Sequence, residues 1–166
     1  KGLLHHNLFF DEDFDAHARD IYTTPQWPAR PLFYVSCPSQ TDATVAPEGK
    51  ENLFILIPVA PNLKDDKATK DRYFNLVLNR IERFTGEPFG QDIIYRRDFA
   101  TRDFISEYNS FKGNAYGLAN TLSQTAILKP ALKNKNVKNL FYTGQLTVPG
   151  PGVPPSLISG KLAAEQ

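Results

Sequence analysis

The sequence predicts an α+β fold that ends in one strand–helix unit of an α/β nucleotide-binding domain. Three observations support this prediction. Short apolar segments of strand composition dominate the N-terminal part, a long amphipathic segment lies in the middle, and a Pro/Gly-rich turn joins an apolar segment to a helix near the C-terminus. At 166 residues the chain is long enough to bury a core.

The N-terminal part alternates predicted strands with turns. Strands are expected over 2–10, 32–37 and 53–59, and the segment 11–22 predicts a short helix because acidic residues occupy its first turn. Proline-rich and turn-forming residues separate these elements. The segment 53–59 is apolar at successive positions, so we expect it to be the central strand of the sheet.

The middle of the chain is dominated by one amphipathic helix, expected over 65–85 and ended by Gly86. Its apolar face consists of Tyr73, Phe74, Val77, Ile81 and Phe84. The opposite face mixes charges of both signs, which favours packing inside the protein over lying on a membrane. A fourth strand is expected over 92–98 and a short helix over 100–108.

The C-terminal part predicts a strand, a turn and a helix in succession. Residues 140–143 form an apolar segment that stops at Gly144, and the helix expected over 156–165 follows Pro154 and Pro155. Prolines are tolerated in a first helical turn because the N–H groups there have no intrahelical partner. This order of elements brings backbone N–H groups and the positive end of a helix against a ligand oxygen. We therefore expect an electron-rich ligand here.

Composition excludes several functional classes. A formal charge of +1 gives no electrostatic footprint for nucleic acid, and the longest apolar run, 53–60, is too short to span a bilayer. The chain has a single cysteine, Cys37, which excludes an internal disulfide. We expect it to be a small, partly buried apolar residue and not a catalytic thiol. The chain contains no methionine, which favours a fragment of a longer polypeptide.

The three histidines offer little for metal binding. His5 and His6 are adjacent, so in a strand they would point to opposite faces and could not form a same-face metal pair. One of them is a candidate for handling a proton. His17 is expected on the surface of a helix. No metal site is predicted.

Several short motifs occur together in a fixed order. They are His5-His6-Asn7, Ala46-Pro47-Glu48-Gly49, Gly113-Asn114-Ala115-Tyr116-Gly117 and, near the C-terminus, Asn139, Gly144, Pro149-Gly150-Pro151-Gly152-Val153-Pro154 and Gly160. Through them the chain resembles the C-terminal portion of the bacterial-type phytoene desaturases, FAD-dependent carotenoid desaturases of the amine-oxidase-like superfamily. That family commonly has Gly-Ala-Gly-Thr-His where this chain has Gly144-Gln145-Leu146-Thr147-Val148.

The resemblance implies FAD as cofactor and desaturation of a carotene such as phytoene as the reaction. It assigns residues 1–115 to part of a substrate-binding domain, and 116–166 to the return segment that completes a Rossmann-like FAD-binding domain. The Gly-x-Gly-x-x-Gly fingerprint is absent from this chain, so an N-terminal dinucleotide-binding part of the same protein is the expected partner. A carotene substrate also implies a cytoplasmic protein that associates peripherally with the membrane.

The resemblance also implies specific site residues. Backbone N–H groups at the helix end would stabilise negative charge on a flavin that has accepted hydride, and Val153, Ser156 and Leu157 are the expected donors because proline has no N–H. The expected cofactor-binding residues are Gly144, Gln145, Pro149, Gly150, Gly152, Val153, Pro154, Ser156 and Leu157. The expected substrate-tunnel residues are Phe33, Phe54, Tyr116 and Leu118.

Two alternatives stay open at this point. A carotenoid isomerase or ketolase would share the flavin segment and differ in the tunnel. A non-enzymatic lipid- or prenyl-binding protein on the same fold would lack the flavin, and the flavin absorbance of the purified full-length protein distinguishes the two classes.

Overall fold

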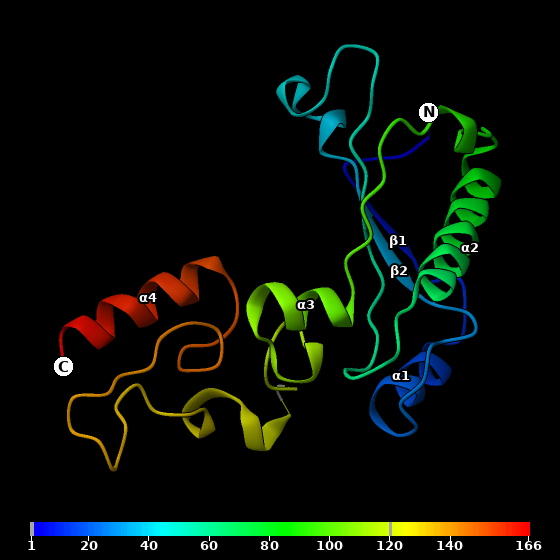
Figure 1. Ribbon diagram of the computed structural model, residues 1–166. Helices are drawn as coiled ribbons and strands as arrows, with labels where there is room; N and C mark the ends of the chain where they lie inside the picture. Colours follow the sequence, from blue (N-terminus) through cyan, green and yellow to red (C-terminus); the bar gives the residue numbers. More distant parts are fainter. Residues whose placement is uncertain (1, 120) are drawn as a thin grey trace. The chain divides into compact units, whose positions relative to one another are not determined.

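In the computed structural model, which describes residues 2–119 and 121–166, the N-terminal part folds around a three-stranded antiparallel sheet (Figure 1). Its strands are β1 (His6–Phe9), β2 (Phe33–Ser36) and β3 (Phe54–Leu56). They lie in the order β1–β2–β3, so β2 is the central strand. All three predicted strands are confirmed, and each is shorter than expected.

The prediction that the third strand is central is wrong, because β3 lies at an edge of this sheet. Its ladder with β2 pairs Phe54 with Ser36 and Ile55 with Val35. Phe54 is 57% exposed, so an apolar residue here does not mean burial within the described chain. Apolar patterning reports how apolar each face of a strand is, and it does not report how many strands lie beside it.

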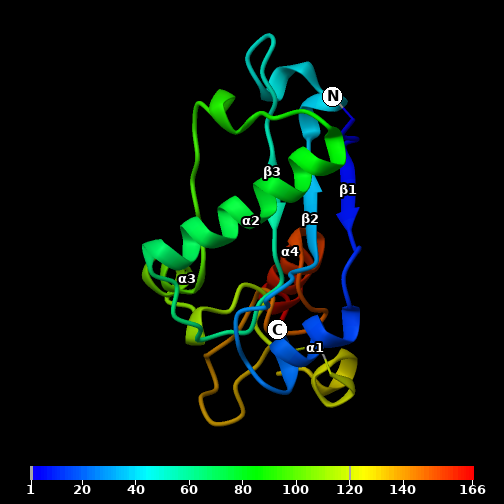
Figure 2. The same cartoon turned by 90° about the vertical axis from the view of Figure 1, so that its right-hand side faces the viewer.

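One long helix, α2 (Lys67–Thr85), lies across one face of the sheet (Figure 2). It begins at Asp66, whose carboxylate accepts a hydrogen bond from the Thr69 N–H at 3.0 Å, and it ends at Gly86, which has a left-handed φ of 72°. The predicted helix is confirmed, except that Phe84 is 65% exposed. The buried core of this part consists of Phe9, Phe33, Val35, Val77 and Ile81.

The helix α1 (Phe14–Tyr22) confirms the second predicted element and corrects the placement of His17. His17 is 4% exposed and not on the surface. Its Nδ1 accepts a hydrogen bond from the Leu32 N–H at 3.0 Å, and its Nε2 donates to the Pro58 carbonyl at 2.7 Å. Both contacts require the neutral tautomer that carries hydrogen on Nε2. His17 therefore joins α1 to the chain around β2 and β3.

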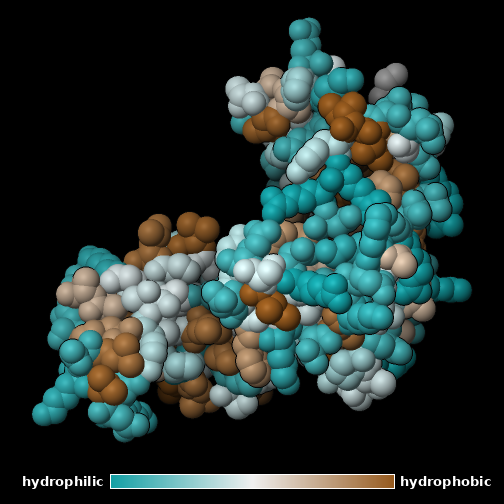
Figure 3. Space-filling model, viewed as in Figure 1, coloured by the Kyte–Doolittle hydropathy of each residue, from teal (hydrophilic) through white to brown (hydrophobic). Residues whose placement is uncertain are grey.

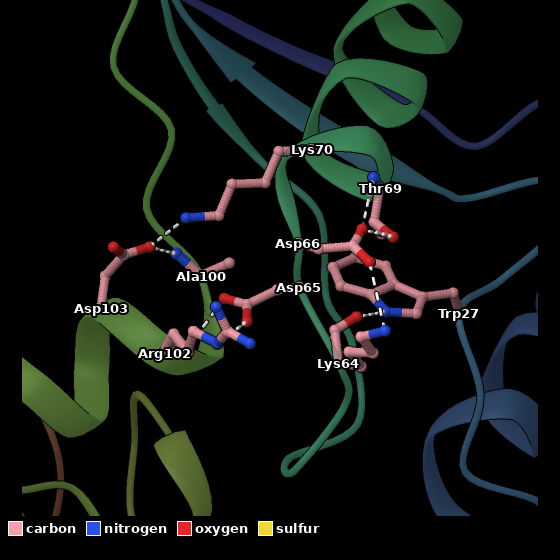
Figure 4. A network of polar contacts seen from close by, with 9 residues as sticks. All are labelled: Trp27, Lys64, Asp65, Asp66, Thr69, Lys70, Ala100, Arg102 and Asp103. Carbon is pink, nitrogen blue, oxygen red and sulfur yellow. Dashed lines mark hydrogen bonds and ion pairs between the residues drawn. The ribbon is translucent and has the colours of Figure 1, made fainter.

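Polar contacts fix the start of α3 (Thr101–Tyr108), which confirms the helix predicted over 100–108 (Figure 4). The Asp103 carboxylate accepts a hydrogen bond from the Ala100 N–H at 2.8 Å, as an acidic side chain at the third helical position does in a capping box. It also accepts one from the Lys70 ammonium of α2 at 2.6 Å. One carboxylate thus caps α3 and connects it to α2.

Replacing Asp103 by asparagine is expected to lower the free energy of unfolding by about 1–2 kcal/mol at neutral pH, because a cap and a charge-assisted hydrogen bond are weakened. Burial raises the pKa of Asp103, but the hydrogen bonds from Lys70 and Ala100 outweigh it and hold the pKa below its ordinary value. The stabilisation is therefore complete above about pH 4 and is lost as the pH falls through the lower folded-state pKa. Urea unfolding followed by Trp27, the one tryptophan of the chain, measures both effects. An equal stability of the two proteins at pH 7 would contradict this role.

The segment 92–98, predicted as a strand, is not one in the structure. Side-chain contacts of Arg96 hold it instead of a hydrogen-bonded ladder. The guanidinium pairs with Asp71 at 3.0 Å and Asp98 at 2.7 Å, and it lies 3.8 Å from the centre of the Phe74 ring. Strand-like composition was misleading here because it does not report whether another strand lies beside the segment.

The division of the chain into two compact units falls within α3. We call them unit 1, Lys1–Phe104, and unit 2, Ile105–Gln166. Unit 2 contains short 3₁₀ turns followed by the helix α4 (Val153–Ala164). The C-terminal helix is confirmed and includes the two prolines expected before it. The assignment of 1–115 and 116–166 to functional domains stays a prediction.

The strand predicted over 140–143 is wrong, because the structure has one antiparallel bridge there, between Lys133 and Phe141. The Tyr142 N–H also donates to the Leu132 carbonyl at 2.7 Å. A segment of this length forms a strand when a neighbouring segment pairs with it along a continuous ladder of hydrogen bonds. In the described part of unit 2, its pairing is limited to this one bridge.

Candidate functional site

The candidate site lies at the N-terminal end of α4, in the turn that leads into the helix. Gly150 and Gly152 have φ of +135° and +114°, which side-chain-bearing residues rarely adopt. A Cβ at Gly152 would also lie 3.4 Å from Cδ of Pro155. The backbone of this turn can approach a ligand closely because both positions are glycine.

Two prolines limit the N–H groups that the helix end offers to a ligand. Pro154 and Pro155 stand in the first turn and carry no N–H. The Ser156 N–H donates to the Gly152 carbonyl at 3.0 Å, so it is not available, contrary to the expectation from sequence. The N–H groups of Gly152 and Val153 are the ones that the first turn leaves for a ligand.

A concave site of about 460 Å³ opens beside this helix end and is lined by Tyr116, Gln145, Gly152, Val153, Ser156 and Leu157. The sequence assigned all six to the cofactor or the tunnel, and the structure brings them together. Leu157 is 72% exposed and contributes its side chain, because its N–H lies beyond the first turn. The other expected cofactor-binding residues do not line the concave site: Gly144, Pro149 and Gly150 lie in the turn, and Pro154 lies in α4.

Sequence reasoning missed two hydroxyl groups, of which Ser159 joins the turn to α4 and Thr147 closes the turn on itself. Ser159 is fully buried, and its Oγ accepts a hydrogen bond from the Gly144 N–H at 2.8 Å while donating to the Ser156 carbonyl at 2.7 Å. The Thr147 hydroxyl donates to the Gly144 carbonyl at 2.9 Å. The one available signal was a small polar residue between apolar ones on a helix, which is too common to identify such a contact.

His5 and His6 lie in unit 1, at the start of β1. Their ring centroids are 4.2 Å apart, so the expectation that they point to opposite faces is wrong. His5 precedes β1 in a bend, and strand alternation does not apply to it. His5 Nδ1 is hydrogen-bonded to the Thr41 hydroxyl, and His6 Nδ1 to the Tyr34 hydroxyl, each at 2.6 Å. Proton handling by either histidine stays a prediction.

Of the tunnel candidates in unit 1, Phe33 is misassigned. It is fully buried, stacks on Phe9 with ring centroids 4.4 Å apart, and has the Arg80 guanidinium 4.7 Å from its ring centre. Phe33 is therefore core and cannot line a tunnel. Phe54 remains exposed at the sheet edge, and Leu118 in unit 2 is partly buried.

A larger depression of about 560 Å³ in unit 1 is lined by charged side chains alone. Its five aspartates and four basic residues are Asp65, Asp66, Lys67, Lys70, Asp71, Arg96, Asp98, Arg102 and Asp103. The Asp65 side chain is 1% exposed, and one of its carboxylate oxygens lies 3.8 Å from Nε of the Arg102 guanidinium. The other oxygen accepts a hydrogen bond from the backbone N–H of Arg102 at 2.9 Å (Figure 4). Because these charged side chains pair with one another, we assign them a role in stabilising the fold and not in catalysis or ligand binding.

Two further searches cover the described residues, 2–119 and 121–166. No cluster of three or more His, Cys, Asp or Glu side chains there is arranged to hold a metal ion. Within the same residues, no helix combines the length and the apolar character needed to cross a membrane.

The chain is similar over nearly its whole length to proteins named for carotenoid chemistry. It is 45% identical over 163 residues to a carotenoid 3,4-desaturase of Haloarcula japonica, covering 98% of this chain and 33% of that protein. It is 35% identical over 168 residues to a zeta-carotene-forming phytoene desaturase of Myxococcus xanthus, covering 99% and 32%. It is 30% identical over 167 residues to a 4,4′-diaponeurosporene oxygenase of Staphylococcus haemolyticus, covering 99% and 33%. The chain therefore spans about a third of the length of these relatives. No family model matches it.

Proposed function

The chain is homologous to the C-terminal part of the carotenoid desaturases, and on that premise we propose that it supplies this part of an FAD-dependent enzyme that desaturates a carotene. The observation that carries the proposal is the concave site at the start of α4. Five of its six lining residues belong to the flavin segment that the resemblance singled out, and the sixth, Tyr116, was expected in the substrate tunnel.

The residues at this helix end fit a flavin. Gly150 and Gly152 have backbone conformations that side-chain-bearing residues rarely adopt, so the backbone of the turn is bare at both positions and a ligand can approach it closely. Val153 is the first residue of α4 and Gly152 is its N-cap, so the N–H groups of both belong to the helix end that carries the positive end of the dipole and have no intrahelical acceptor. Donors of this kind suit a ligand edge that carries partial negative charge.

When bound, the flavin supplies the hydride acceptance that desaturation requires. In the proposed mechanism, Gly152 and Val153 hold the electron-rich edge of the cofactor with their N–H groups and favour added negative charge on it. Tyr116 and Leu157 provide apolar surface beside it, which limits the access of water. Ser159 and Thr147 keep the turn in this shape from behind.

The exposed apolar side chains of α4 support the proposal that this helix is buried within a larger domain. Val153, Leu157, Ile158 and Leu162 are 75%, 72%, 49% and 38% exposed, so apolar side chains cover much of this helix (Figure 3). A helix that is apolar on several sides is normally buried. We propose that it packs against the dinucleotide-binding part of the same FAD domain, which is N-terminal in the relatives' family.

The proposed substrate is a carotene, because two of the relatives are named for carotene or carotenoid desaturation. Oxygenation or isomerisation of a carotenoid is the alternative, and one relative is named an oxygenase. A non-enzymatic lipid-binding role is a further alternative, which a flavin-free full-length protein would favour. A substrate dissolved in lipid is the reason to propose peripheral contact with the membrane, and the exposed Leu122 and Ile127, 90% and 92% accessible, are candidates for that contact.

The test is to incubate the purified, FAD-loaded full-length enzyme with a panel of carotenes in liposomes and identify the products by chromatography. The proposal predicts products with additional double bonds and no added oxygen. Oxygen-containing products would support the oxygenase alternative, and geometric isomers of unchanged mass would support the isomerase. Unaltered carotenes with flavin present would contradict an enzymatic role on this substrate class.

A further inference from the structure

The side chain of Gln145 offers a hydrogen-bond acceptor to the concave site. Its Nε2 donates to the Ala115 carbonyl at 3.1 Å. Because a carbonyl oxygen can only accept, this contact fixes which end of the amide faces Ala115 and leaves Oε1 on the other side of the amide. Oε1 has no hydrogen-bond partner among the residues that the structure describes. Since Gln145 lines the concave site, this oxygen is available to a ligand there.

The residue after Gln145 also contacts the loop 114–117, so the turn is attached to this loop at two points. The side chain of Leu146 occupies the space beside Gly117, where a Cβ would overlap its Cδ2 atom. Gly117 has a φ of +80°, and its N–H donates to Oδ1 of Asn114 at 2.6 Å. Gln145 is therefore held against a loop of defined shape, and a side chain placed in advance loses less freedom when a ligand binds.

The lining of the concave site favours an uncharged donor on the ligand. Among the described residues that line it, none carries a formal charge. A phosphate oxygen would be repelled by the Gln145 oxygen, with no lysine or arginine in the lining to offset it. An N–H group on an uncharged ring would instead satisfy that oxygen. Of the parts of FAD, the isoalloxazine ring therefore fits this site better than the pyrophosphate does.

We infer that Gln145 recognises the flavin ring by accepting a hydrogen bond from N3–H, the one N–H group that an oxidised isoalloxazine carries. The inference rests on the proposed function and gives Gln145 a specific role within it. The family that the chain resembles commonly has alanine at this position, which has no side-chain acceptor. The contact is thus an addition that this chain makes to the flavin segment, and its loss weakens flavin binding without abolishing it.

The experiment measures the Kd of the flavin-free full-length enzyme for FAD and for FAD methylated at N3. The analogue lacks the N3–H group and keeps the hydroxyl and amino donors of the rest of the cofactor. A site built to accept an N–H discriminates against an analogue that lacks it, so the wild-type enzyme is expected to prefer FAD.

Gln145→Met keeps the bulk of the side chain and removes the acceptor. It is expected to weaken FAD binding by about three- to tenfold, the value of one hydrogen bond. The preference for FAD over the analogue is expected to fall by the same factor, because the bulk of the methyl group is the one difference that remains. Gln145→Ala, which introduces the residue of the family pattern, is expected to lose at least as much of this preference.

Leu146→Ala is the matched control. It removes the other side-chain contact between this turn and the loop 114–117, and Leu146 does not line the concave site. It is expected to keep the wild-type preference for FAD over the analogue. This control separates recognition of the ring from positioning of the loop.

The outcomes also separate the inference from the proposed function. A wild-type enzyme that binds neither FAD nor the analogue contradicts the function itself. Equal wild-type affinities for the two flavins, or an unchanged preference in both Gln145 variants, overturn the inference alone. An equal loss of preference in Leu146→Ala shows that packing of the loop sets the preference, and overturns it as well.

Discussion

Replacing Gly152 by leucine is expected to abolish flavin retention by the full-length enzyme. Gly152 has a φ of +114°, and a side chain there is strained by about 1–3 kcal/mol before any contact is considered. Its Cβ would lie 3.4 Å from Cδ of Pro155, and because Gly152 lines the concave site, a leucine adds bulk beside the proposed cofactor. Strain and obstruction together predict affinity weakened by about a hundredfold or more.

The measurement is the flavin-to-protein ratio after purification, followed by titration of the apoprotein with FAD. Gly160→Ala is the matched control, because Gly160 lies within α4 and a Cβ there meets nothing within 4 Å. The control is expected to retain its flavin. Full occupancy in a folded Gly152→Leu enzyme would show that this turn does not contact the cofactor.

Replacing Phe33 by alanine is expected to lower the free energy of unfolding by about 3–5 kcal/mol. Phe33 is fully buried, its ring stacks on Phe9, and the Arg80 guanidinium lies over it. Truncation leaves a cavity in the core between α2 and the sheet and removes the aromatic surface on which a buried cation rests. Such a loss is a large part of the roughly 5–15 kcal/mol by which native proteins are stable.

Urea unfolding monitored by Trp27 fluorescence measures this effect, because the Trp27 ring lies 4.7 Å from Tyr73 on α2 and so reports on unit 1. Phe54→Ala provides the comparison at an exposed phenylalanine and is expected to cost less than about 1 kcal/mol. A Phe33→Ala protein as stable as Phe54→Ala would argue that Phe33 lies at a surface, as the tunnel assignment required.

Local signals predicted those elements whose causes lie within a short stretch of sequence. The helix α2 was predicted from an apolar face at helical spacing and a stop at Gly86, and the structure adds the carboxylate cap at Asp66. The start of α4 follows from Pro154 and Pro155 next to glycines that only a turn requires. Five of the six residues that line the concave site fall in one continuous stretch, Gln145 to Leu157, which the family resemblance singled out, whereas Tyr116 lies about 30 residues earlier in the chain.

Long-range contacts decided what the sequence could not reveal. His17 is buried because Leu32 and Pro58, far along the chain, provide a donor and an acceptor for its ring. Phe33 is core and not tunnel because α2 covers that face of β2, which an apolar pattern does not specify. The side chain of Lys129 lies against Gly150, about 20 residues later in the chain, and no sequence motif predicted this contact.

The most direct test of the central claim is the FAD content of the full-length enzyme that contains this chain. FAD released from the denatured protein is identified by chromatography and compared with the protein concentration. A flavin site completed by the start of α4 predicts stoichiometric FAD in the wild-type enzyme and its loss in Gly152→Leu. A wild-type enzyme that holds no FAD, even after incubation with an excess of the free cofactor, would contradict the account.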